Sequence, residues 1–153
     1  MITPEQLATY PSGLAVMQAI LSGELPEAPM AKTAGFWLSE VAEGHIVFSG
    51  LPKKEFNNPF GTVHGGWPAL LLDSAMAAVV HSVLKKGEAF TTVEFKVNLV
   101  RPIFESTGVV ACTAKVISRG RRIATSEGRI TDANGKLMAH GTETCIIMPA
   151  EAS

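Results

Sequence analysis

The longest apolar stretch of the chain runs from Phe56 to Leu84 and carries a single formal charge, Asp73. From about Gly65 onward, apolar residues fall on nearly every face of a helix. Pro68 suits the first turn, where its missing N–H costs nothing. A helix that is apolar all round belongs in the middle of a domain. We therefore expect a long central helix with a carboxylate about two turns into it.

A period-two pattern replaces the helical pattern after Gly87. Between Thr92 and Val100 apolar and polar residues alternate, which predicts a half-buried antiparallel strand. Turn signals at 119–121 and 132–135 separate the strands that follow. The expected strands are 35–40, 45–51, 92–100, 109–118, one carrying small residues at Ala124, Ser126 and Gly128, and 136–148.

The first residues of the chain predict a short helical segment. Thr3 and Gln6 form a capping-box pattern. A helix is expected from about Ser12 to Leu21, with Gly23 able to end it. Residues 24–32 contain two prolines and predict an extended connector.

The order of elements is helix, two strands, long apolar helix and four strands, without the alternation of a doubly wound fold. This order predicts an α+β protein with one antiparallel sheet of about six strands curled around the central helix. The length of 153 residues favours a single domain over 1–153. We expect a helical N-terminal segment over 1–32 and a core over 35–148.

Composition narrows the function classes. The net charge of −1 argues against a nucleic-acid binder that relies on overall basicity. Cys112 and Cys145 follow no metal-ligand spacing, so we expect small apolar strand residues in a reducing compartment, and no metal site. The N-terminus lacks the basic region and apolar run of a signal peptide. We therefore expect a cytoplasmic protein without a membrane span.

The turn before the central helix is polar and rich in glycine. Gly65 or Gly66 can offer a backbone N–H at the helix N-terminus, where negative charge is stabilised. Asn58 and His64 are polar groups able to orient a substrate, and Asp73 supplies an isolated carboxylate. Together these groups are the parts of an acyl-transfer site.

The pattern Asn58…Gly61-x-x-His64-Gly65-Gly66 followed by Asp73 resembles the phenylacetate-degradation type of hotdog-fold acyl-CoA thioesterases, related to 4-hydroxybenzoyl-CoA thioesterase. The resemblance covers about 35–148 and implies a hotdog fold that hydrolyses an acyl- or aryl-CoA thioester. It implies no cofactor, because CoA is part of the substrate. It also implies a homodimer, often paired into a tetramer. Some relatives carry a hydroxyl one turn after the carboxylate, where this chain has Ala77.

Spacing along the central helix suggests that two subunits share each site. Gly65 and Asp73 are eight residues apart, about 12 Å of helical rise. A thioester carbon lies about 3–3.5 Å from its attacker, and its oxygen lies about 3 Å from the donor N–H. We therefore predict that Asp73 of one subunit works with Gly65 and Asn58 of its neighbour.

Each candidate residue also has a purely structural interpretation. Asp73 can pair with an interior arginine or cap. Alternatively it acts as base or nucleophile, which the sequence does not separate. Gly65, Asn58 and His64 can simply shape the turn. The turn with Arg119, Arg121 and Arg122 can simply be solvent-exposed. The resemblance suggests instead that these guanidinium groups bind the phosphates of CoA, with Arg101 as a weaker candidate.

Two other functions compete with thioester hydrolysis. A hotdog hydratase or dehydratase would need a different pairing of acid and histidine around the loop. A non-catalytic acyl-CoA-binding module would need the fold alone. A serine hydrolase is disfavoured because the chain has no Gly-x-Ser-x-Gly motif.

Overall fold

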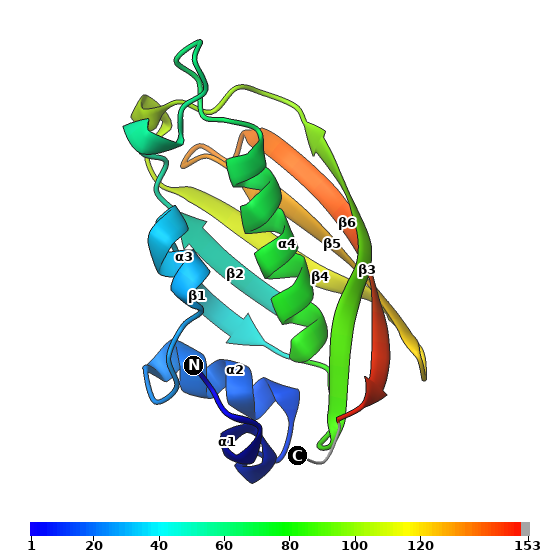
Figure 1. The fold of residues 1–153 in the computed structure, drawn as a ribbon. Coiled ribbons are helices and arrows are strands. Elements are labelled where there is room, and N and C mark those ends of the chain that lie inside the picture. Colours follow the sequence, from blue (N-terminus) through cyan, green and yellow to red (C-terminus); the bar gives the residue numbers. More distant parts are fainter. Residues whose placement is uncertain (151–153) are drawn as a thin grey trace.

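The computed structural model describes residues 1–150, and its centre is a six-stranded antiparallel sheet in the order β1-β2-β4-β5-β6-β3 (Figure 1). β4, β5 and β6 are joined by consecutive hairpins, while β1 and β3 form the two edges. The strands are β1 Phe36–Ala42, β2 His45–Gly50, β3 Glu88–Leu99, β4 Val110–Arg119, β5 Ile123–Thr131 and β6 Leu137–Pro149.

Helix α4, Gly66–His81, lies across one face of this curled sheet (Figure 1). Leu71, Leu72 and Met76 are fully buried against the strands. The small residues of β5 permit this approach, since a Cβ at Gly128 would lie 2.9 Å from Leu72 Cδ2 and 3.0 Å from Met76 Cγ. The predicted hotdog arrangement, with a central helix wrapped by about six strands, is confirmed.

One stripe of α4 is covered incompletely by its own chain. Counting from Leu70 as position i, the residues at i, i+3, i+4, i+7 and i+11 are only half-buried. This spacing places them on one side of the helix. The central position predicted for the helix is confirmed, but within one chain this stripe is left partly uncovered. The stripe consists of Leu70, Asp73, Ser74, Ala77 and His81.

Strand β3 also departs from its prediction. It begins earlier, at Glu88. Of its alternating apolar residues, Val97 is half-buried against the core as predicted, whereas Val93, Phe95 and Leu99 are 58%, 44% and 57% exposed. These residues are exposed because β3 is an edge strand. The register against β6 also shifts between Thr92 and Glu94, as in a β-bulge.

The N-terminal segment forms three short helices, α1 Pro4–Thr9, α2 Gly13–Ser22 and α3 Pro29–Ala34. The capping box of Thr3 and Gln6 is present, and Gly23 ends α2 in the left-handed conformation. The extended connector predicted over 24–32 is wrong in its second half. Pro29 occupies the first turn of α3, where proline is tolerated, and left-handed Gly35 ends that helix.

Two short 3-10 turns, η1 Lys54–Phe56 and η2 Glu105–Thr107, lie in the connections at the N-terminal end of α4. Helix α2 reaches the opposite end of α4, where the Gly13 N–H donates to the Leu84 carbonyl at 3.0 Å. Cys112 and Cys145 are free, buried strand residues, as predicted. Within 1–150, no helix has the length and apolar character needed to cross a membrane.

Candidate active site

The loop before α4 is held in place by its backbone. The N–H of His64 donates to the Phe56 carbonyl at 2.8 Å, and the N–H of Val63 donates to the Ile103 carbonyl at 2.9 Å. The first bond ties the loop to η1, and the second ties it to the segment that follows β3. They fix the path by which the chain enters the helix, and therefore the direction of the first backbone N–H groups.

Asn58 organises the tip of this loop. Its Nδ2 donates to Thr62 Oγ1 at 2.7 Å, and its Oδ1 accepts the Phe60 N–H at 2.9 Å. Such local bonds are typical of an Asx turn. Within one chain Asn58 therefore acts as a turn residue, and its predicted contact with substrate remains a prediction.

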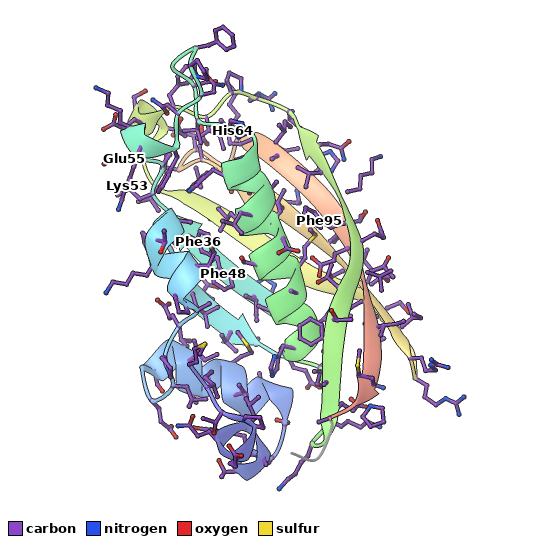
Figure 2. The ribbon with its side chains drawn as sticks, in the orientation of Figure 1. Phe36, Phe48, Lys53, Glu55, His64 and Phe95 are labelled. Atoms are coloured by element: carbon purple, nitrogen blue, oxygen red, sulfur yellow. The ribbon has the colours of Figure 1, made fainter. Side chains whose placement is uncertain are left out.

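His64 distinguishes the two glycines that follow it. The Gly66 N–H donates to His64 Nδ1 at 3.0 Å, which leaves the proton of a neutral imidazole on Nε2. No residue within 1–150 accepts a hydrogen bond from the Gly65 N–H. His64 itself is exposed at the N-terminal end of α4 (Figure 2). Of the two glycines, Gly65 is therefore the one able to donate to a substrate oxygen.

Asp73 lies two turns into α4, on the half-buried stripe. No side chain or backbone group within 1–150 donates a hydrogen bond to it or forms an ion pair with it. Partial burial raises the pKa of its carboxyl group. The structural alternative, a carboxylate paired with an arginine or cap, thus finds no partner in the described part of the chain.

A second carboxylate belongs to the same region and was missed by the sequence analysis. Glu143 of β6 is 1% exposed, and its Oε1 accepts hydrogen bonds from Thr92 Oγ1 at 2.8 Å and Cys145 Sγ at 3.2 Å. Its Oε2 is buried without a partner. Burial, as the largest cause, and the nearby charge of Asp73 raise the pKa of Glu143 to about 7.

The bulge in β3 explains how Thr92 reaches this carboxylate. Strict alternation would place Thr92 on the opposite face from Phe95. The register shift instead lets both residues share the face of Glu143. The hydroxyl that contacts Glu143 therefore comes from strand β3. It does not come from α4, where some relatives carry a hydroxyl at the position of Ala77.

Strand β6 did contain a signal for Glu143. Its residues Ala139, Gly141, Cys145 and Ile147, all buried, share one face by alternation, and Glu143 falls in the middle of that series. A charged residue among inward-facing apolar positions is uncommon unless it is paired or functional.

Within 1–150, the predicted arginines do not contact Asp73 or Glu143. Arg119 forms a salt bridge with Glu88, whose pKa it lowers, whereas Arg121 and Arg122 are exposed. Arg101 donates from Nη1 to the Leu137 carbonyl at 2.6 Å.

The predicted arginines lie at two different ends of the molecule. Arg101 lies at the end that carries Gly65, because the neighbouring Ile103 bonds to the loop before α4. The turn with Arg119 lies at the other end, beside the start of β3. One chain therefore brings together the loop residues and Arg101, and places Asp73 midway along α4. It leaves the three-arginine turn distant from Gly65.

Comparisons with known proteins agree with this architecture. The family model described as Thioesterase superfamily matches residues 60–139. Human acyl-coenzyme A thioesterase 13 is 28% identical over 108 residues, which are 70% of this chain and 76% of the human protein.

Two solved structures show the same fold over most of the chain. A phenylacetic acid degradation-related protein from Ralstonia eutropha is 29% identical, with a TM-score of 0.78 and coverage of 85% of this chain and 98% of that one. The E. coli PaaI protein of the phenylacetic acid degradation operon is 22% identical, with a TM-score of 0.78 and coverage of 94% and 100%. The chain therefore belongs to the thioesterase superfamily and is a thioester hydrolase with the PaaI-like hotdog fold.

Proposed function

We propose that this protein hydrolyses acyl- or aryl-CoA thioesters to the free acid and CoA, with Asp73 as the reacting carboxylate. The observation that carries the proposal is the state of Asp73, which is half-buried with a raised pKa and no partner within 1–150. The similarity to human acyl-coenzyme A thioesterase 13 supports CoA as the thiol part of the substrate.

The Gly65 N–H polarises the thioester carbonyl in this proposal. It lies at the N-terminus of α4, where the helix dipole adds to the positive field on an oxyanion. His64 and Asn58 hold the loop and orient the substrate, and Gly66 supports His64 by its hydrogen bond. Asp73 either takes a proton from the attacking water or attacks the carbonyl itself to form an anhydride that water then cleaves.

The proposed site is built from two subunits of a homodimer. Within one helix, Gly65 and Asp73 are separated by about 12 Å of rise, too far for one carbonyl to contact both. A two-fold axis beside antiparallel α4 helices would bring Asp73 of one subunit opposite Gly65 of the other. The half-buried stripe of α4 and the exposed apolar residues of β3 support such an interface.

The same symmetry gives the arginine turn a role in the proposal. It would place Arg121 and Arg122 of one subunit on the side of the partner's loop, where the CoA nucleotide would leave the site. Guanidinium groups suit phosphate oxygens, and these two are exposed. Arg119 could bind a phosphate only after its salt bridge to Glu88 breaks. With the salt bridge intact, Arg119 would instead hold the turn in position. Arg101 lies near the loop of its own chain and is a further candidate.

A panel of acyl- and aryl-CoA substrates tests the proposal. The purified protein is incubated with each thioester and a thiol reagent that reports free CoA. Release of CoA that depends on Asp73 supports the proposal. A protein that binds acyl-CoA without releasing CoA would instead be a binding module, and hydration of an enoyl-CoA without release of CoA would indicate a hydratase.

A further inference from the structure

Glu143 is a buried acidic side chain for which the proposed reaction assigns no task. Its carboxylate is 1% exposed, and within 1–150 no lysine, arginine or histidine forms an ion pair with it. A buried, unpaired charge is costly, so such a group is normally replaced, paired or kept protonated. Its two hydrogen bonds both reach Oε1, which leaves Oε2 as the atom able to hold a proton.

The geometry places this group beside Asp73. Met76 of α4 faces Gly128 of β5 and Gly141 of β6, as shown by the contacts a Cβ at either glycine would make. Successive residues of a helix turn by about 100°, so Asp73 lies about 60° from Met76 around the axis. The direction is away from Leu72 and toward β3, the side on which Thr92 bonds to Glu143.

The two carboxylates are electrostatically coupled, since the charge of Asp73 raises the pKa of Glu143 to about 7, in addition to the larger effect of burial. The thiol of Cys145 also contacts Glu143, and its hydrogen bond lowers the pKa of Glu143. Glu94 of β3 lies on the other face of the sheet, where it pairs with Thr144, and its charge raises the pKa of Glu143 from there. Glu143 therefore keeps its proton until near neutrality. Two coupled acids of this kind titrate as a pair.

We propose that Glu143 is a positioning residue of the hydrolytic site, which holds a proton beside ionised Asp73 and, on losing it, makes Asp73 a stronger base. This role rests on the proposed function of Asp73. No additional reactant is needed, because the proton of Glu143 passes to solvent as the pH rises. A second negative charge nearby increases the affinity of Asp73 for a proton.

Carboxyl titration by NMR tests the coupling directly, without any substrate. In the wild-type protein the side-chain carbon of Glu143 should titrate near pH 7. In D73N its midpoint should fall by about one pH unit, because one nearby charge is gone. The matched control is E94Q, which removes an exposed carboxylate on β3 and should lower the midpoint less. An unchanged midpoint in D73N would overturn the proposal.

Activity then tests the role. In wild type, kcat should rise about threefold as the pH passes through about 7, because loss of the Glu143 proton makes Asp73 a stronger base. The rise is smaller than the change in the basicity of Asp73, because the rate of proton transfer follows only part of such a change. E143Q keeps the acceptor for Thr92 and Cys145 but has no proton to lose, so its profile should lack this rise. A uniform fall in kcat at every pH, with the rise retained, would overturn the role and leave a structural one. Absence of hydrolysis by the wild-type protein would instead reject the proposed function and this role with it, so the two failures are distinguishable.

Discussion

Gly66 donates its backbone N–H to Nδ1 of His64 at 3.0 Å, two residues back along the chain. This bond occupies one of the two glycine donors at the start of α4. It also fixes the imidazole so that a neutral ring presents an Nε2–H to solvent. The Gly65 N–H, which has no acceptor within 1–150, remains the donor available to a thioester oxygen. Within 1–150 the two adjacent glycines therefore differ, since the Gly66 N–H is bonded and the Gly65 N–H is not.

Asp73→Asn should lower kcat by about 10²- to 10⁴-fold, as expected for loss of a positioned base. KM should change much less, because the amide keeps the size and polarity of the side chain. The measurement is CoA release at saturating thioester. Ser74→Ala changes the next residue of the same half-buried stripe and serves as the matched control. Equal losses in both variants would mean that the stripe matters only for assembly.

Mixed dimers of Asp73→Ala and Asn58→Ala test whether subunits share each site. After co-expression and separation by two affinity tags, one site of a mixed dimer carries both changes and the other carries neither. Activity should return to about half of the wild-type value per dimer, because one complete site remains. Mixed dimers as inactive as each parent, with both subunits folded, would contradict the shared site.

Replacing Arg121 and Arg122 by Ala should raise KM for an acyl-CoA, while leaving a short thioester that lacks the nucleotide unaffected. The reason is that guanidinium groups would contact only the phosphates. Steady-state kinetics on the two substrates provides the measurement. Arg129→Ala, an exposed arginine on β5, is the control and should affect neither substrate. A similar rise in KM for both substrates would place the two arginines elsewhere in the mechanism.

Phe95→Glu should weaken self-association and activity together. Phe95 is 44% exposed on β3, and Figure 2 shows it on the strand beside α4. A charge buried in an apolar interface is costly. Light scattering across a concentration series should show dissociation at a higher protein concentration than for wild type. Met30→Glu is the control, at a residue 55% exposed on α3. An active wild-type monomer would contradict the dimer.

Stability should respond to pH through Glu143. Its pKa is raised from 4.5 to about 7 in the folded protein, so between these values the unfolded chain releases a proton that the folded chain keeps. The free energy of unfolding of wild type should therefore fall, relative to Glu143→Gln, as the pH rises from about 4.5 to 7, and then level off. Urea titrations at several pH values measure this difference. Glu94→Gln, at an exposed site, should alter the pH dependence of the free energy of unfolding less than Glu143→Gln does.

Much of the architecture could be predicted because it is encoded locally. The apolar run of α4, the turn at 132–135 and the caps of α1 and α2 depend on neighbours in the sequence, and all are present. The loop residues and Asp73 could likewise be singled out, since a polar, glycine-rich turn and a lone acid are visible in an apolar stretch. The connector over 24–32 was partly wrong because proline also begins helices, as Pro29 does.

Tertiary structure decided the surroundings of the carboxylate. The bulge after Thr92 turns its hydroxyl toward Glu143, and these two residues are 51 positions apart in the chain. No local pattern records a register shift between two strands, because the shift is fixed by pairing with β6 and by packing on α4. The exposure of Phe95 has the same origin, since the sequence sets the alternation of β3 but only the sheet order makes it an edge strand. Periodicity therefore specified the elements, while long-range pairing determined which side chains meet.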